Sequence, residues 1–312
     1  MGPRVLRRKL LELSKRSRVF MFGNHKGGVG KTTVVLQLAA ALARMGFRIL
    51  VIDMDPQANL TRRMGLEYDE NDPFSTVSEA VKENREGVGA GVVLGVNWND
   101  ERTGQPTSEA ELIDIIPARF DLINREQEAG AVGAVRRLKK ALTGWTSHYD
   151  FILIDTRPDL GHLVQLAMAA ADEVVLVFEP DYDTVAGAIR MQEFVEEHGE
   201  DLGNPELRVG MAFVNRYDRS SEQDYQLAGL PESLKSKLVE LDAGGAVVGL
   251  DDGGEDYRLP RYIPRIARIK EADGAGVSVS EYRNRKGRET TAIFDRLAEK
   301  FVERVIREAE AA

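Results

Sequence analysis

The sequence contains no cysteine, and its few histidines are His25, His148, His162 and His198. Without cysteine the chain forms no disulfide and no thiolate metal site. The histidines are scattered and lack the spacing of a metal-ligand set. No apolar stretch reaches the length that spans a membrane, and no apolar run of a secretory signal follows the basic N-terminus. These absences exclude disulfide-stabilised, thiolate-metal and membrane-spanning classes.

Net positive charge is also lacking, because the formal net charge of the 312 residues is −9. Any contact with nucleic acid therefore requires local basic patches rather than overall charge. Residues 1–17 form one such patch, a basic N-terminal extension in which Leu6, Leu10 and Leu13 have helical spacing. This pattern fits an amphipathic helix that binds DNA, anionic lipid or a partner, and it fits a solvated extension equally well.

Alternating apolar runs and helical patterns predict the fold class of residues 18–312. Apolar runs typical of buried parallel strands lie at 18–23, 47–55, 111–118, 149–155, 172–178 and 207–215. Helical patterns lie at 31–46, 124–142, 160–171 and 184–198. This alternation predicts an α/β domain with a doubly wound, mostly parallel sheet flanked by helices. Two glycine-rich stretches, 85–108 and 242–256, interrupt it as insertions and are expected to be mobile surface excursions.

The stretch NHKGGVGKTT, residues 24–33, lies between the first predicted strand and helix. Gly30, Lys31 and Thr32 supply the second half of the general phosphate-binding pattern G-x-x-x-x-G-K-[ST]. His25 stands where the strict pattern requires its first glycine. A glycine loop that leads into a helix N-terminus directs backbone N–H groups toward an anion. The stretch therefore predicts a phosphate site with an additional lysine, Lys26.

The run K-G-G-V-G-K-T-T resembles the deviant Walker A motif of the ParA/MinD family of P-loop ATPases. The resemblance implies that Lys31 serves its own ATP, whereas Lys26 reaches the nucleotide held by the other subunit of a dimer. A solvated loop lysine is the alternative for Lys26. The nucleotide-binding residues that the resemblance implies are Lys26, Gly27, Gly28, Val29, Gly30, Lys31, Thr32, Thr33, Asn215 and Pro264.

Acidic residues that follow two predicted strands complete the expected ATP site. The run VIDMDPQ resembles the second motif of the family, which implies that Asp55 orients the attacking water and that Asp53 lies near Mg²⁺. Either acid is alternatively a cap of the next turn. Asp155 ends a Walker B-like strand and would hold Mg²⁺ together with Thr32. The expected catalytic residues are thus Lys26, Lys31 and Asp55, and the expected cofactors are ATP and Mg²⁺.

The loop after Asp155 departs from the family pattern. The family usually has D-x-P-P-S there, whereas Arg157 and Asp159 replace the first proline and the serine. Two interpretations of Arg157 stay open: a surface ion-pair residue, or a residue that tunes a dimer or partner contact.

Two later segments complete the resemblance. Asn215 ends the strand that reads the adenine edge in the family, although asparagine at a strand end is also an ordinary turn former. The segment 261–282 resembles a ParA segment in which Pro264 lies against adenine. Basic residues in and around that segment are candidates for nonspecific DNA binding: Arg258, Arg261, Arg265, Arg268, Lys270, Arg283, Arg285, Lys286 and Arg288.

The resemblance implies a slow, partner-stimulated ATPase that forms ATP-sandwich homodimers and binds nonspecific DNA. It would segregate a chromosome, plasmid or other cargo with a ParB-like adaptor, in the cytoplasm and on the nucleoid. The alternative is a MinD-like positioning ATPase anchored to the membrane through the basic N-terminal segment. The amphipathic stretch 292–312 has an acidic tip and is expected to pack on the domain rather than on anionic lipid. The sequence identifies neither the cargo nor the adaptor.

Overall fold

A seven-stranded sheet forms the centre of the protein in a computed structural model, which describes residues 2–13, 16–71, 73–100, 103–242, 245–250 and 256–311. The strand order is β3-β4-β2-β5-β1-β6-β7, and only the edge strand β3 runs antiparallel to its neighbour within this sheet. The strands are β1 Arg18–Gly23, β2 Ile49–Met54, β3 Leu94–Gly95, β4 Ile113–Ile116, β5 Phe151–Thr156, β6 Glu173–Phe178 and β7 Arg208–Val214. The predicted doubly wound, mostly parallel sheet is confirmed.

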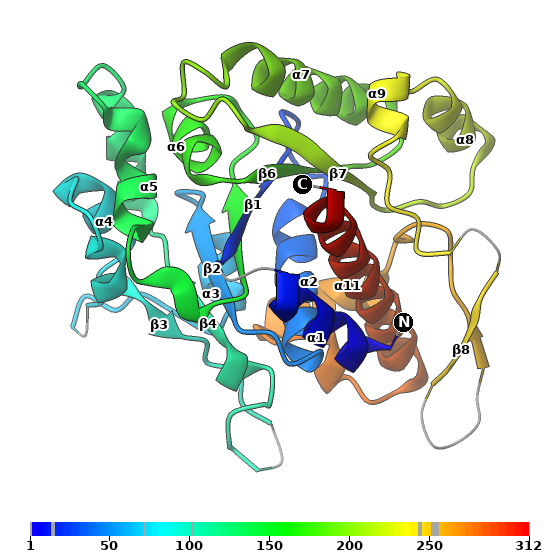
Figure 1. Cartoon of the computed structure of the whole chain (residues 1–312). Helices are drawn as coiled ribbons and strands as arrows, with labels where there is room; N and C mark the ends of the chain where they lie inside the picture. Colours follow the sequence, from blue (N-terminus) through cyan, green and yellow to red (C-terminus); the bar gives the residue numbers. More distant parts are fainter. Residues whose placement is uncertain are drawn as a thin grey trace.

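Helices cover both faces of the sheet (Figure 1). The layer that includes the terminal helices consists of α1 Pro3–Leu13, α2 Lys31–Arg44, α3 Asn59–Arg63, α10 Ala267–Ala275 and α11 Arg285–Ala311. The opposite layer consists of α4 Val77–Glu83, α5 Arg137–Leu142, α6 His162–Ala170, α7 Tyr182–His198, α8 Ser221–Ala228 and α9 Glu232–Lys235. Successive residues of a strand point to opposite faces. In β1, Phe20 and Phe22 therefore face the first layer and Met21 faces the second.

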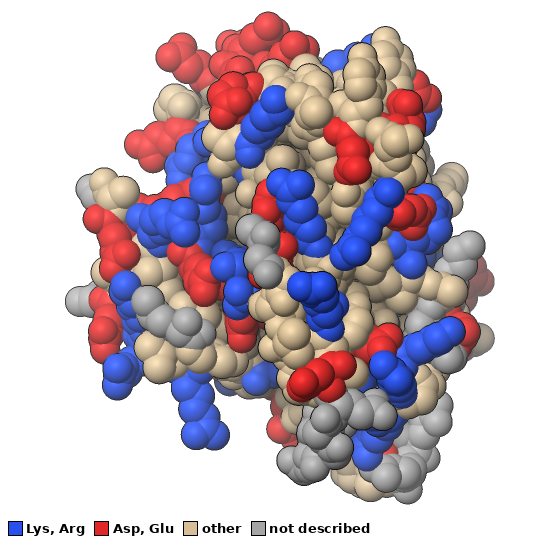
Figure 2. All heavy atoms as spheres, turned by 90° about the vertical axis from the view of Figure 1, so that its right-hand side faces the viewer, with Lys and Arg blue, Asp and Glu red and all other residues tan. Residues whose placement is uncertain are grey.

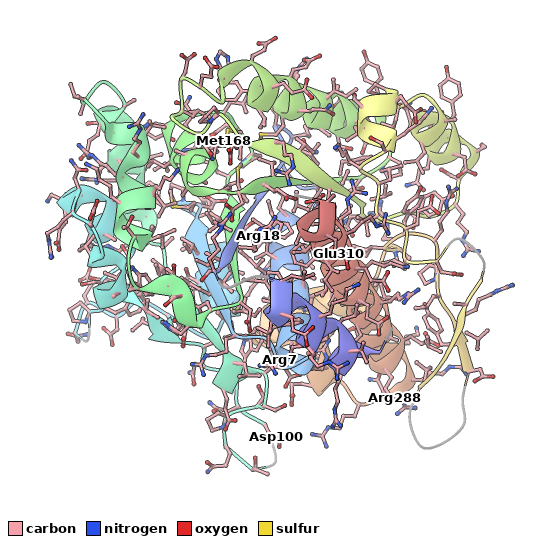
Figure 3. The ribbon with its side chains drawn as sticks, in the orientation of Figure 1. Arg7, Arg18, Asp100, Met168, Arg288 and Glu310 are labelled. Carbon is pink, nitrogen blue, oxygen red and sulfur yellow. The ribbon has the colours of Figure 1, made fainter. Side chains whose placement is uncertain are left out.

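The two ends of the chain pack together on one face of the sheet. Leu6 and Leu10 of α1 are buried in the same apolar core as Phe301 of α11. Lys9 and Glu310 join the two helices through an ion pair of 2.7 Å, and Figure 3 labels Glu310 near the end of α11. Two of the three regularly spaced N-terminal leucines, Leu6 and Leu10, thus belong to the protein core, whereas Leu13 is exposed. The expectation that the C-terminal stretch packs on the domain is confirmed.

One predicted helix is wrong as a continuous element. Residues 124–142 are divided among two 3₁₀ helices, η3 Phe120–Glu128 and η4 Ala134–Arg136, and the short helix α5. Gly130 and Gly133 lie between these turns, and Gly133 has a φ of +71°. A left-handed residue cannot continue a right-handed helix, so the apolar spacing alone overestimated its length.

Part of the segment 85–108 packs on the domain, although many of its described residues are exposed. It contains η1 Val88–Val92 and the edge strand β3, and the side chain of Trp98 is buried. The Trp98 indole N–H donates to the Arg63 carbonyl oxygen at 3.0 Å, so the segment packs against α3. In the other glycine-rich stretch, β8 Val247–Gly249 pairs with β9 Asp256–Arg258, while residues 243–244 and 251–255 lie outside the described residues.

Candidate functional site

A cleft of about 800 Å³ lies at the carboxyl ends of the parallel strands. Neighbouring strands β2, β5 and β1 each end there, which brings together loops that are far apart in the sequence. The lining residues come from all the motifs that the sequence singled out: Gly28, Val29, Gly30, Lys31, Thr32, Thr33, Asp55, Gln57, Asn59, Arg63, Thr156, Pro158, Asn215, Arg216, Pro264, Arg265, Ile266, Ala267 and Ile269. The topology thus assembles one concave site from distant segments.

The glycine loop is held in shape by side chains from other elements. Gly30 has a φ of +87°, and a β-carbon at this position would stand 2.4 Å from the Asn215 amide nitrogen. That amide donates to the Val29 carbonyl oxygen at 2.8 Å. Asn215 therefore braces the loop directly in this structure, and its proposed contact with adenine stays a prediction. Only glycine fits the conformation and the close approach at position 30.

Asn24 is a functional residue that the sequence reasoning missed. Its buried amide N–H₂ donates to the carbonyl oxygens of Val177 and Thr184, while its side-chain oxygen accepts from the Lys26 backbone N–H at 2.8 Å. The Lys31 ammonium lies 3.5 Å from the Asn24 carbonyl oxygen. Asn24 thus connects the start of the loop to β6 and α7. The only sequence signal was a polar residue directly after a buried strand.

The two lysines of the loop lie in different surroundings. Lys31 is buried beneath the loop, and this burial lowers the pKa of its ammonium, while the charges of Asp155, Asp55 and Asp159 act in the opposite direction. Lys26 is exposed at the surface and forms an ion pair of 3.0 Å with Asp183, at the start of α7. Lys31 can therefore meet a phosphate inside the cleft, whereas Lys26 pairs with Asp183 and is not among the residues that line the cleft.

Asp155 is almost fully buried at the end of β5, with an exposed fraction of 1%. Neither of its carboxylate oxygens has a hydrogen-bond partner within the described part of the chain. Burial raises its pKa to about 7, and the charge of Asp53 adds to this, whereas the charge of Lys31 lowers it. A buried carboxylate without a partner is costly, so a cation that meets it through water would relieve this cost.

This arrangement fits Mg²⁺ that arrives with phosphate. Among the residues that the structure describes, no group of three or more His, Asp or Glu side chains could hold a metal by itself. Mg²⁺ commonly keeps several waters and binds one or two carboxylates together with substrate phosphates. Asp155 and Thr32 are suited to such a site.

Asp53 has partners, in contrast to Asp155. Its carboxylate accepts from the Thr61 N–H at 2.9 Å, the Thr61 hydroxyl at 2.8 Å and the Asp55 N–H at 3.1 Å. Burial raises its pKa to about 6, although these hydrogen bonds lower it. Asp53 therefore stabilises the turn before α3, the alternative that the sequence left open. It pairs in register with Asp155 across the sheet, and its role near Mg²⁺ stays a prediction. Asp55 lines the cleft as expected.

An ion-pair network forms the wall of the cleft opposite Asp55. Arg216, with an unusual left-handed φ of +55°, donates to the Gly28 carbonyl oxygen at 2.7 Å and also pairs with Glu179. Arg265 pairs with the same Glu179 at 3.3 Å and with Asp218 at 3.0 Å. The sequence reasoning missed Glu179 and Arg216, and it grouped Arg265 with the DNA candidates although the side chain lines this cleft.

Arg63 also lines the cleft, although no motif in the sequence predicted it there. Its guanidinium donates to the Thr33 hydroxyl at 3.2 Å, so a cation from α3 touches the phosphate loop. The buried Trp98 fixes the backbone of the same residue from the other side.

The remaining DNA candidates lie among acidic residues. Arg258, Arg261, Arg283, Arg285 and Lys286 are exposed, and Arg288 is half-buried. Arg261 pairs with Glu240, Arg283 with Asp100 and Arg285 with Glu289. Figure 2 views the right-hand side of Figure 1 and shows Lys and Arg interspersed with Asp and Glu. The side chains of Arg268 and Lys270 lie outside the described residues. DNA binding by this set stays a prediction.

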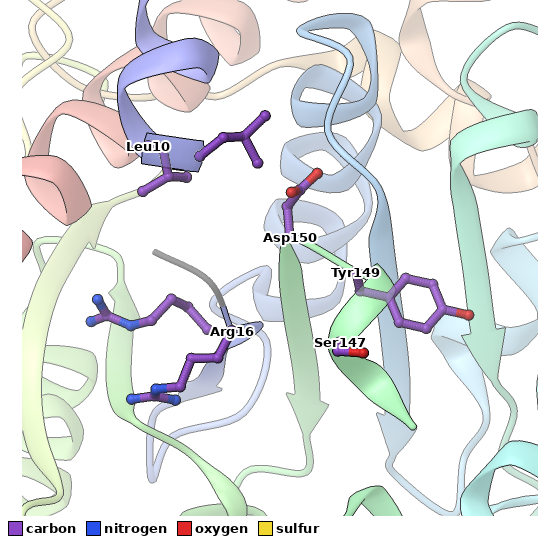
Figure 4. A pocket seen from close by; sticks show the side chains of 7 residues that line it. Leu10, Arg16, Ser147, Tyr149 and Asp150 are labelled. Carbon is purple, nitrogen blue, oxygen red and sulfur yellow. The ribbon is translucent and has the colours of Figure 1, made fainter. Parts of the chain in front are cut away.

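A smaller cavity of about 340 Å³ lies at the opposite edge of the sheet (Figure 4). Its polar lining is engaged within the protein, because Asp150 accepts from the Arg48 N–H and the Tyr149 hydroxyl donates to Asp114. It contains none of the predicted site residues. Among the described helices, none has the length and hydrophobicity needed to cross a membrane.

Comparisons with known proteins agree with this geometry. The model of the AAA domain family matches residues 17–209. A probable plasmid-partitioning protein ParA of Thermus thermophilus is 30% identical over 293 residues, which cover 93% of this chain and 79% of that protein. The sporulation initiation inhibitor protein Soj of Bacillus subtilis is 32% identical over 266 residues, covering 85% of this chain and 91% of Soj.

Solved structures show the same architecture. Apo McdA of Cyanothece has a TM-score of 0.71 at 22% identity and covers 92% of this chain and 100% of that chain, a likeness in fold. Cobyrinic acid a,c-diamide synthase of Mycobacterium smegmatis, solved with bound ADP and magnesium, has a TM-score of 0.57 at 27% identity over 68% of this chain and 80% of that chain. On its matched domain, its relatives and its shared cleft motifs, the chain belongs to the ParA family of P-loop ATPases.

Proposed function

We propose that this protein is a Mg²⁺-dependent partition ATPase that forms ATP-sandwich dimers and binds nonspecific DNA. It segregates a chromosome, plasmid or other cargo with a ParB-like adaptor, in the cytoplasm and on the nucleoid. The observation that carries the proposal is the difference in burial between the two lysines of the loop. Lys31 is buried in the cleft, and Lys26 is exposed. The probable plasmid-partitioning protein among its relatives supports the biological setting.

The cleft has the size and lining that ATP requires. Its volume lies within the usual range of cofactor sites. The backbone of the glycine loop and Lys31 would bind the phosphates, and the base would stack on Pro264, which lines the same cleft. Thr32 and Asp155 would hold Mg²⁺, which neutralises phosphate charge when bound. Asp55, which lines the cleft, would orient a water molecule for attack.

The edge of the sheet that carries the cleft also exposes large aromatic side chains. Phe120 and Tyr182 are 70% and 75% exposed, and each follows the carboxyl end of a strand. Large apolar residues that stand free at the rim of a site are typical of a surface that another molecule covers. A second copy of this chain, placed face to face, would cover them and bring Lys26 to the nucleotide of its partner. ATP would then favour the dimer because both subunits contact both nucleotides.

The N-terminal helix favours DNA over a membrane as the bound surface. Leu6 and Leu10, two of the three regularly spaced leucines, are buried against the domain and are not available to an anchor, whereas Leu13 is 42% exposed. Cosedimentation with nonspecific duplex DNA and with anionic liposomes, each with ATP or ADP and across a salt series, tests the choice. We expect DNA binding that requires ATP and weakens steeply with salt. Liposome binding without DNA binding would replace the proposal with a MinD-like role.

Substitution of the exposed lysine tests the cross-subunit role. Lys26→Gln is expected to leave ATP binding by the monomer intact and to abolish stimulated hydrolysis. Lys82→Gln, at an exposed position of α4, is the matched control and should behave as wild type. Normal stimulated turnover in Lys26→Gln would exclude the cross-subunit role. Asp55→Ala is expected to trap the ATP dimer, and a variant that still cycles would remove Asp55 from the mechanism.

A further inference from the structure

The two residues that depart from the family pattern contact each other. Arg157 and Asp159 flank Pro158 in the loop between β5 and α6, and the Arg157 guanidinium forms an ion pair with the Asp159 carboxylate. The other oxygen of Asp159 accepts from the Gly161 N–H at 2.9 Å. The two departures therefore form one unit, which closes the loop on itself.

A third residue, Glu126 of η3, connects this unit to another part of the chain. One carboxylate oxygen of Glu126 accepts from Arg157 at 3.3 Å, and the other accepts from the His162 N–H at 2.9 Å. Gly161, which precedes α6, has no side chain to cap that helix. A β-carbon there would stand 3.0 Å from the nearer Glu126 oxygen. Glu126 thus caps α6 from a segment about 35 residues earlier in the chain.

The inner side of the same loop contacts the phosphate loop. Pro158 lines the cleft, and a β-carbon at Gly27 would lie 3.3 Å from its ring. The Thr156 hydroxyl donates to the Phe22 carbonyl oxygen at 2.7 Å and fixes the start of the loop to β1. The loop 157–161 is therefore held between the glycine loop on one side and Glu126 on the other.

We propose that Arg157, Asp159 and Glu126 form a brace that positions loop 157–161 against the phosphate loop before nucleotide binds. The exposed fractions of the three side chains are 27%, 31% and 25%, so their charges are partly shielded from solvent. Because the loop is already ordered, nucleotide binding does not include the entropy cost of ordering it. Arg157 is accordingly a positioning residue within its own subunit. The nucleotide part of this inference rests on the proposed function, whereas the ordering of the loop does not.

Arg157→Gln tests the brace because it leaves the Glu126 cap of α6 in place. We expect the backbone amides of residues 159–163 to exchange hydrogen about tenfold faster in the ligand-free variant. We also expect its Kd for Mg²⁺-ATP to rise about threefold to tenfold by titration calorimetry, with little change in the thermal midpoint. Arg157→Lys keeps the charge and should recover most of both effects. Lys300→Gln is the control, because Lys300 pairs with Glu303 on α11 at exposed fractions of 29% and 25%.

Each alternative result overturns the inference. Wild-type exchange in Arg157→Gln would show that the loop needs no brace. Faster exchange in Lys300→Gln as well would trace the effect to general destabilisation. Faster exchange in Arg157→Gln with an unchanged Kd would show that the loop is held but does not serve the site. Absence of Mg²⁺-ATP binding by the wild type would refute the proposed function and the coupling to nucleotide, and the exchange experiment would still decide whether the brace exists.

Discussion

Asp155 at the carboxyl edge of the central sheet and Glu173 at its amino edge are both buried carboxylates, and they differ in their partners. At the carboxyl edge, Asp155 ends β5 and neither of its oxygens has a hydrogen-bond partner within the described residues. At the amino edge, Glu173 begins β6, and one of its oxygens accepts from Arg18 at 2.9 Å and from Arg208, whereas its other oxygen has no hydrogen-bond partner within the described residues. Figure 3 labels Arg18 at the start of β1. Both acids have exposed fractions of 1% or less.

The difference in partners indicates that Asp155 belongs to a ligand site and that Glu173 belongs to a structural contact. A buried charge without a partner lowers stability, and a chain retains it where a ligand completes it. A buried charge between two arginines is largely compensated within the protein. The comparison therefore predicts that changes at the carboxyl edge affect activity more than stability, and that changes at the amino edge do the reverse.

The largest expected effect is the loss of turnover on Asp155→Asn. Removal of the charge takes away a group that would hold Mg²⁺, and we expect ATP turnover to fall at least about 100-fold. The thermal midpoint of the ligand-free variant should stay the same or rise, because an uncompensated buried charge is removed. Steady-state turnover and thermal denaturation measure the two effects. A variant that unfolds earlier and turns over normally would reverse the comparison.

Arg18→Ala tests the opposite edge. It leaves Glu173 with Arg208 alone, and above about pH 8, where the Glu173 carboxyl is charged, we expect the free energy of unfolding to fall by about 2 kcal/mol, since breaking a buried ion pair is costly. The Kd for ATP, measured below the unfolding temperature, should change less than about twofold. Arg16→Ala is the control, because the ion pair of Arg16 with Asp172 is more exposed and should contribute below about 1 kcal/mol. Equal losses in both variants would contradict the special role of the buried pair.

The pH dependence of the free energy of unfolding provides a second test of Glu173 at the amino edge. Burial and the neighbouring Glu308 raise the pKa of Glu173 to about 8, against the opposing charges of Arg208 and Arg18. The folded protein thus holds this proton more tightly than the unfolded chain, where the pKa is near its ordinary value. The stabilisation is complete below about pH 4.5 and is lost as the pH rises toward about 8.

Glu173→Gln should flatten this dependence. We expect the wild type to lose roughly 3 kcal/mol of unfolding free energy between about pH 5 and pH 8 through this group. The lowered pKa of Glu308 has the opposite sign, but its effect falls below that window. Urea denaturation at several pH values measures the slope. An identical slope in the variant would assign the dependence to other groups.

The sequence predicted those parts of the molecule that have a local pattern. The long apolar runs identified the parallel strands, and the glycine loop, Asp55, Asn215 and Pro264 reached one cleft as their motifs implied. Residues that act through distant contacts had no such pattern. Glu126 reaches α6 from a 3₁₀ helix, and Glu179 meets arginines that lie far along the chain. A run of basic residues likewise does not reveal the acids that other segments supply to it, as for Arg261 and Arg283, and DNA binding by this set stays a prediction.

The smallest expected effect concerns the exposed pair of Lys26 and Asp183, which lies at the carboxyl edge but has the character of a surface contact. Both side chains are at least half exposed, so Asp183→Asn should change the free energy of unfolding by less than about 0.5 kcal/mol. The same change frees Lys26 from a contact within its own subunit.

If Lys26 acts across the dimer, Asp183→Asn should lower the protein concentration for ATP-dependent dimerisation about twofold, as measured by analytical ultracentrifugation. The double variant with Lys26→Gln should lose this gain, because the freed lysine is its only source. A gain that persists without Lys26 would mean that Asp183 opposes the dimer through its own charge. Dimerisation would then depend on the negative charge of Asp183 rather than on a contact made by Lys26.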